Sequence, residues 1–100
     1  MIHFEDLWEK CENYYKDNNI DNSINFIFDS LALKLELLKS LTQKENLPAE
    51  ELMQAKKIIL GEILFTLTNL SLKENINVFD ALNSALHQNS IQNYTVKYSK

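Results

Sequence analysis

The sequence contains no arginine, and it has one glycine, one proline and one cysteine among its 100 residues. Folds rich in turns need glycine and proline, so their scarcity favours long uninterrupted helices. A single cysteine, Cys11, excludes an intramolecular disulfide, and this fits the reducing cytoplasm in which we expect the chain to work. Cys11 follows Leu7 and Trp8 at helical spacing, so we interpret it as a core residue.

All ten basic residues are lysines, and the net charge is −4. Without a basic stripe there is little to displace the counterions of a nucleic acid, so we expect no nucleic-acid binding. The N-terminal residues are acidic, which argues against a signal peptide. The longest apolar stretch, residues 58–67, is broken by Gly61, Glu62 and Thr66, so we also expect no membrane span.

Apolar residues recur with the period of an α-helix in four segments, at about residues 4–16, 22–44, 48–72 and 77–90. Asn22 or Ser23 can cap the second segment, and Asn77 can cap the fourth. Pro48 suits the first position of the third helix. The sequence therefore predicts an all-α four-helix bundle, with residues 1–90 as one helical domain. Residues 91–100 alternate weakly at Tyr94, Val96 and Tyr98, so we expect an extended C-terminal tail.

The second segment carries apolar residues on more than one side. Leu31, Leu35 and Leu38 share one stripe, whereas Leu33 and Leu37 lie on another. A helix that is apolar on several sides usually contacts several partners. In so short a chain we expect some of them to come from other copies, as in a homodimer or tetramer.

Two glutamates stand inside apolar runs, Glu36 in the second segment and Glu62 in the third. A buried carboxylate is unfavourable unless it is paired or binds a cation. Glu62 also begins a polar stripe that continues through Thr66, Asn69 and Lys73. Either these residues form solvated helix faces, or the two glutamates line a groove that binds Mg²⁺, a cation that prefers oxygen ligands.

Three stretches resemble the MazG-like all-α nucleotide pyrophosphohydrolases. Residues 58–70 read Ile-Ile-Leu-Gly-Glu-Ile-Leu-Phe-Thr-Leu-Thr-Asn-Leu, where family members commonly read Glu-Glu-Leu-Gly-Asp-Leu-Leu-Phe-x-Leu-x-Asn-Leu. Residues 75–82 resemble the family's Gly-Ile-Asp-x-Glu-Glu-Ala-Leu, and residues 30–35 resemble its Asn-Leu-Ala-Leu-x-Leu. The resemblance implies an oligomeric helical enzyme that uses Mg²⁺ to cleave (d)NTPs to (d)NMP and pyrophosphate.

The sequence departs from the family at the metal ligands. The family's Glu-x-x-Asp falls on Ile59 and Glu62, so one carboxylate is missing. Its Glu-x-x-Glu falls on Leu38 and Leu41, or on Glu36 and Lys39 if the register slides by two residues. The resemblance thus leaves Glu62 and Glu36 as candidate metal ligands.

The resemblance also suggests residues that would bind the nucleotide. The family's C-terminal Lys-Asn-x-x-x-Tyr is matched at Asn89, with Tyr94 displaced from the tyrosine position. Asn69 and Lys73, on the stripe of Glu62, complete the candidate set.

Three hypotheses follow. The first is a divergent MazG-like (d)NTP pyrophosphohydrolase domain whose catalysis is weak or lost. The second is a structural or regulatory helical module for oligomerisation or partner binding, without enzymatic activity. The third is a helical chaperone of the secretion or flagellar type, which would bind an amphipathic helix in a groove.

Overall fold

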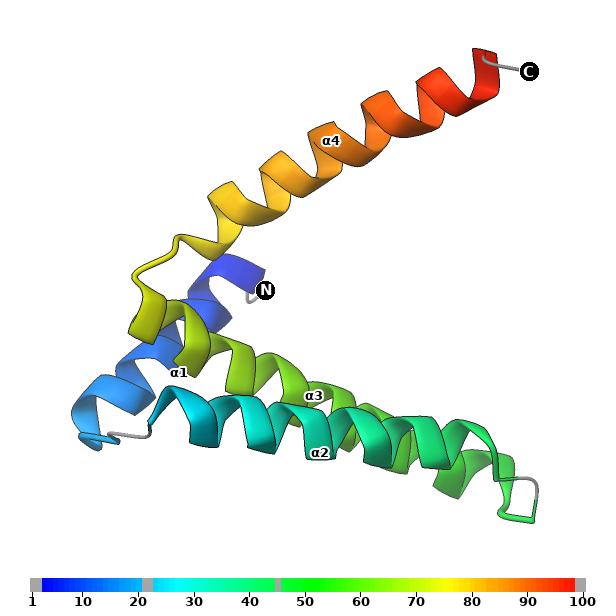
Figure 1. Ribbon diagram of the computed structural model, residues 1–100. Coiled ribbons are helices and arrows are strands. Elements are labelled where there is room, and N and C mark those ends of the chain that lie inside the picture. The colour runs from blue at the N-terminus through cyan, green and yellow to red at the C-terminus, as the bar shows by residue number, and fades with distance from the viewer. Residues whose placement is uncertain (1–2, 21–22, 45, 99–100) are drawn as a thin grey trace.

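The computed structural model describes residues 3–20, 23–44 and 46–98, with side chains as far as residue 91. The described residues form four helices and no strand: α1 (Phe4–Asp17), α2 (Ile24–Thr42), α3 (Ala49–Glu74) and α4 (Val78–Tyr98). Figure 1 shows them in chain order. The all-α fold class is confirmed, and apart from the C-terminal end the helix limits lie within two residues of the predicted ones.

The predicted N-terminal caps can be checked at two helices. At α2, the Ser23 hydroxyl accepts a hydrogen bond from the Phe26 backbone N–H at 3.1 Å, so Ser23 is the cap. Asn22, the other candidate, lies outside the described residues. Pro48 directly precedes α3 instead of forming its first residue, and Glu50 lies in the first turn, near the positive end of the helix dipole.

A short connection, residues 75–77, sets the direction in which α4 leaves α3. Asn75 adopts a left-handed conformation (φ 55°), and the Ile76 N–H donates to the Ser71 carbonyl at 2.9 Å, which closes the end of α3. The Asn77 carboxamide oxygen then accepts hydrogen bonds from the backbone N–H groups of Phe79 and the following residue. This confirms the predicted cap at Asn77.

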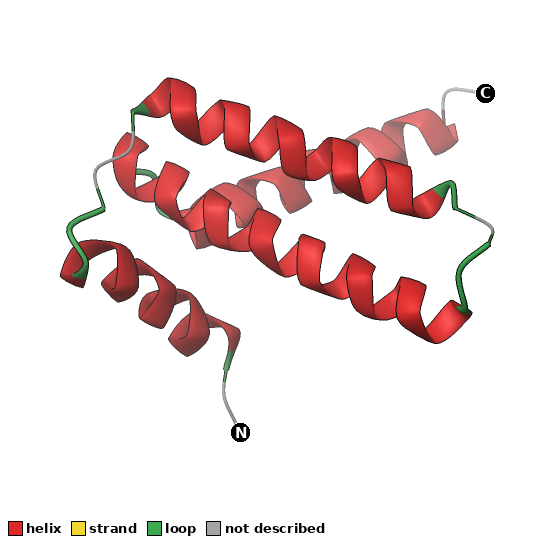
Figure 2. Ribbon diagram, turned by 90° about the horizontal axis from the view of Figure 1, so that it is seen from below, coloured by secondary structure: helices red, strands yellow, loops and turns green. Residues whose placement is uncertain are grey.

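Helices α2 and α3 form a long hairpin, and α1 lies across the C-terminal half of α3 (Figures 1 and 2). Among the residues whose side chains the structure describes, the buried apolar core is small and consists of Trp8, Tyr15, Ile27 and Ile63. Phe28 and Leu35, which share the apolar stripe of Leu31 and Leu38 on α2, are both exposed. Among the described residues, α3 is the helix that packs along α2, and it covers one side of α2.

Helix α4 projects away from the other three helices (Figure 1). Its first turn contacts α1, where the Phe79 ring lies edge-on to Phe4 and Trp8, with ring centroids 6.2 and 6.4 Å apart. Residues 80–91 are all exposed. The predicted four-helix bundle is therefore not closed within one chain, because three helices pack together and the fourth does not join them.

The backbone of residues 91–98 continues α4, although the sequence predicted an extended tail from residue 91. That prediction relied on a weak alternation at Tyr94, Val96 and Tyr98, whose side chains lie outside the described residues. Between residues 78 and 98 there is no glycine or proline to end the helix. Once a helix has formed, each added residue gains a hydrogen bond, so local alternation alone does not stop it.

Within the described ranges, no helix combines the length and apolar character needed to cross a membrane.

Candidate functional site

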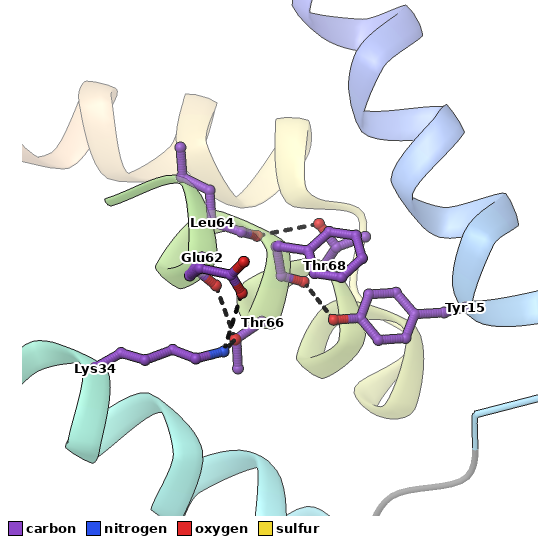
Figure 3. Close-up of polar contacts among 7 residues, drawn as sticks. Tyr15, Lys34, Glu62, Leu64, Thr66 and Thr68 are labelled. Atoms are coloured by element: carbon purple, nitrogen blue, oxygen red, sulfur yellow. Dashed lines mark hydrogen bonds and ion pairs between the residues drawn. The ribbon is translucent and has the colours of Figure 1, made fainter. Parts of the chain in front are cut away.

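A polar cluster joins α2 to α3 (Figure 3). The Lys34 ammonium donates a hydrogen bond to the Thr66 hydroxyl at 2.6 Å, and it lies 3.6 Å from a carboxylate oxygen of Glu62. The Thr66 hydroxyl in turn donates to the backbone carbonyl of Glu62 at 2.9 Å. The carboxylate that the sequence offered as a metal ligand is therefore paired with a lysine.

Helical spacing explains why Lys34 points at α3. Lys34 lies three residues after Leu31 and seven after Ile27, so all three share one side of α2. This side faces α3, because Ile27 is almost fully buried there. A lysine at this position extends its methylene chain along the helix contact and places the ammonium at the edge. The side chain of Lys34 is 24% exposed and that of Glu62 is 54% exposed, so water reaches the ion pair.

Tyr15 attaches α1 to α3. Its hydroxyl donates to the Phe65 backbone carbonyl at 2.9 Å, and the two rings pack with centroids 4.8 Å apart. Burial, followed by the negative charge of Glu62, raises the pKa of Tyr15 to about 12. The phenol therefore remains a neutral hydrogen-bond donor well above neutral pH.

Two open cavities flank this cluster and share Asn69, which is only 4% exposed. The larger has a volume of about 420 Å³ and is lined by Tyr15, Lys16, Asn19, Ile20, Asn69, Leu72 and Lys73. The smaller has a volume of about 240 Å³, and its walls include Tyr14, Ser30, Lys34, Glu62 and Thr66.

Three of the five predicted site residues line the two cavities. Glu62 and Asn69 line the smaller cavity, whereas Asn69 and Lys73 line the larger one. All three belong to the predicted polar stripe of α3. The stripe does not form a solvated face along its whole length, because Thr66 and Asn69 are buried where α1 and α2 approach α3.

The other two predicted residues, Glu36 and Asn89, line neither cavity. Glu36 is exposed and lies two residues after Lys34, which places it about 200° around the helix, away from α3. Asn89 lies on the exposed part of α4, where its amide donates to the Ala85 carbonyl of the same helix at 2.7 Å.

The residues present do not fit a magnesium site of the kind the resemblance implies. Among the residues that the structure describes, no three side chains of histidine, cysteine, aspartate or glutamate gather as a metal site would require. Leu38 and Leu41, which stand at the family's ligand positions in the ungapped register, are half-buried on the same side of α2 as Lys34. Apolar side chains thus occupy these positions, and a lysine ammonium occupies the space beside Glu62.

Several residues at the site were not predicted, among them Lys34, Tyr15 and Lys16. A signal for Lys34 was present, because it shares the stripe of Ile27 and Leu31. Tyr15 stood on the predicted apolar stripe of the first helix, but nothing in the sequence indicated that its hydroxyl bonds to α3. No signal identified Lys16, whose place in the larger cavity depends on how α1 crosses α3.

The chain was compared with models of protein families, with curated proteins and with solved structures, and none of the three comparisons found a match.

Proposed function

We propose that this chain is a structural or regulatory helical module that works by self-association, with other copies completing its core. The observation that carries the proposal is the accessible surface of 8237 Å². A compact monomer of 11.7 kDa exposes about 5,900 Å². Each chain therefore exposes about 2,300 Å² more than a self-sufficient monomer of its size.

The dimensions of the chain support the same proposal. Its radius of gyration is 17.0 Å, whereas a compact domain of this length has a radius of about 13 Å. The difference arises because α4 and the far end of the α2–α3 hairpin extend in different directions (Figure 1). A chain so open gains burial only by contact with other molecules.

The exposed surface is rich in large apolar side chains. On α2 the exposed apolar side chains are Phe26, Phe28, Leu33, Leu35 and Leu37; on α3 they are Met53, Ile58, Leu60 and Leu64. Scattered apolar residues are ordinary on a protein surface, but extended patches mark interaction sites. Two of these exposed residues, Leu33 and Leu37, lie on the apolar second side of α2 that the sequence indicates.

Sedimentation equilibrium of the purified chain tests the proposal. We expect a mass of two or more copies at micromolar concentration, with dissociation only on strong dilution. A single-copy mass across the concentration range, with the helical circular-dichroism spectrum intact, would rule out self-association.

A second candidate is a divergent MazG-like nucleotide-binding domain that retains little or no pyrophosphohydrolase activity. The observation that favours it is the larger cavity, where Lys16 and Lys73 lie with the amides of Asn19 and Asn69. Ammonium and amide groups are suitable donors for phosphate oxygens.

Two measurements test this candidate. The first is binding of (d)NTPs, where Lys16→Gln and Lys73→Gln should each weaken the affinity at least tenfold, and Lys57→Gln, on another part of α3, should not. The second is pyrophosphate release with Mg²⁺ or Mn²⁺, with Glu62→Gln as the control. No binding of any (d)NTP by the natural chain would rule the candidate out.

A further inference from the structure

An apolar groove lies between α1 and α3, with a volume of about 200 Å³. Four residues of each helix line it: Phe4, Leu7, Trp8 and Cys11 from α1, and Gly61, Leu64, Phe65 and Thr68 from α3. On both helices these residues follow the spacing i, i+3, i+4, i+7. Two such rows side by side form a surface against which a third amphipathic helix packs.

The groove carries no group that requires a polar ligand. Its one hydroxyl, on Thr68, donates to the Leu64 carbonyl of the same helix at 3.1 Å, and Thr68 is 1% exposed. A side chain added at Gly61 would meet no atom within 4 Å, so the backbone of α3 is open to close approach there. An apolar helix is therefore the occupant that suits the groove.

Helix α4 has an apolar stripe that its own chain leaves uncovered. Val78, Leu82, Ala85 and Leu86 lie on one side of this 21-residue helix, and Leu82 and Leu86 are 64% and 66% exposed. In proteins most of the stability of a helix comes from packing of its apolar face, and residues 80–91 of α4 are all exposed. The described part of α4 is also rich in asparagine and serine, which are poor helix formers, so α4 needs packing to persist.

The groove and α4 of the same chain do not meet along their lengths. Phe79 packs at one end of the groove, against Phe4 and Trp8, and α4 then runs outward (Figure 1). Leu82 and Leu86 do not line the groove of their own chain. The turn at Asn75 and the cap at Asn77 fix this outward direction.

We propose that the apolar stripe of α4 packs into the α1–α3 groove of a second copy, and that two copies exchange α4 in this way about a two-fold axis. The inference rests on the proposed self-association and names the surfaces that produce it. A two-fold arrangement covers both grooves and both stripes at once. Each chain exposes about 2,300 Å² more surface than a compact monomer. Twice this area, for two chains, lies within the range of total surface that obligate homodimers bury.

Disulfide trapping between two differently marked chains tests the exchange, because Cys11 lines the groove and is the chain's only cysteine. The natural chain is mixed in denaturant with the double variant Cys11→Ser/Leu86→Cys, refolded and treated with a mild oxidant. We expect a covalent heterodimer in the mixture and little covalent dimer from either chain alone. The matched control is Cys11→Ser/His87→Cys, since His87 lies on the polar side of α4; its yield should be at least tenfold lower.

Each outcome has a distinct meaning. If the chain sediments as a dimer but Cys11 forms no disulfide with a cysteine at Leu86→Cys or at Leu82→Cys, the exchange of α4 is overturned. The proposed self-association then still stands. An intramolecular disulfide in the single chain carrying Cys11 and Leu86→Cys would place α4 in its own groove and would likewise overturn it. A folded monomer would refute the proposed self-association itself.

A block in the groove gives an independent test. Gly61 borders the groove and an added Cβ there meets no atom within 4 Å, so the bulky side chain of Gly61→Trp should occupy the groove and weaken dimerisation at least tenfold. Gly61→Ala adds a single methyl group in open space and should dimerise like the natural chain or better. Equal dimerisation of the Trp and Ala variants would contradict the proposal.

Discussion

At the scale of single residues, Tyr15 is the side chain that joins two helices most directly. Its ring packs against Phe65, and its hydroxyl donates to the Phe65 carbonyl at 2.9 Å. Tyr15→Phe keeps the packing and removes the hydrogen bond, so the free energy of unfolding should fall by about 1 kcal/mol. Denaturant unfolding measures this change. Tyr14→Phe is the matched control, because Tyr14 is exposed, and it should have less effect.

The same residue predicts a loss of stability at high pH. Burial raises the pKa of Tyr15 from 10.0 to about 12, so the folded state favours the neutral phenol. The stabilisation linked to this pKa shift is complete below pH 10 and is lost as the pH rises through about 12. Thermal unfolding followed between these pH values should show a decline that is smaller in Tyr15→Phe. An identical decline in both proteins would contradict this prediction.

The Lys34–Glu62 pair should contribute little to stability despite its central place. Glu62 is 54% exposed, and exposed ion pairs are usually worth less than about 1 kcal/mol. Glu62→Gln should therefore change the free energy of unfolding by less than that amount. Lys34→Met should also be tolerated, because the Thr66 hydroxyl still donates to the Glu62 carbonyl. A loss of several kcal/mol in either variant would show that the pair is more important than its exposure indicates.

At the scale of elements, the end of α3 depends on Asn75. This residue has φ 55°, a left-handed conformation that glycine and asparagine adopt more readily than other residues. Asn75→Ala should destabilise the chain by about 1 kcal/mol, whereas Asn75→Gly should be neutral or stabilising. Chemical denaturation of the two variants side by side measures the difference. If alanine is tolerated as well as glycine, the left-handed turn does not limit stability.

Helix limits were largely predictable from the sequence because they depend on local chemistry. Ser23 and Asn77 cap their helices through hydrogen bonds made within three residues along the chain. The end of α4 lies beyond the predicted one because a weak alternation of apolar residues does not stop a helix that has no glycine or proline to end it. In the candidate site, Glu62, Asn69 and Lys73 were placed correctly on one stripe of α3, because a single helix fixes their spacing.

At the scale of the whole molecule, stability should depend on protein concentration. If other copies complete the core, dilution favours the dissociated and less stable chain. The thermal midpoint should therefore rise with concentration, and it should rise less in Gly61→Trp than in Gly61→Ala. Scanning calorimetry over a hundredfold range of concentration checks this. A midpoint independent of concentration would indicate that one chain is stable alone.

The sequence by itself determined the helical class, most helix limits and the surplus of apolar surface, since these follow from local hydrogen bonding, the scarcity of glycine and proline, and the period of the apolar residues. Only the tertiary structure decided which charges meet and which surfaces remain open. Lys34 lies against Glu62 because α2 packs along α3. Glu36 also stands within an apolar run, but it lies on the side of α2 that faces away from α3. Helix α4 stands apart because its direction is set by the left-handed turn at Asn75 and by the contacts of Phe79 with Phe4 and Trp8. These contacts depend on the three-dimensional arrangement of α1 and α3.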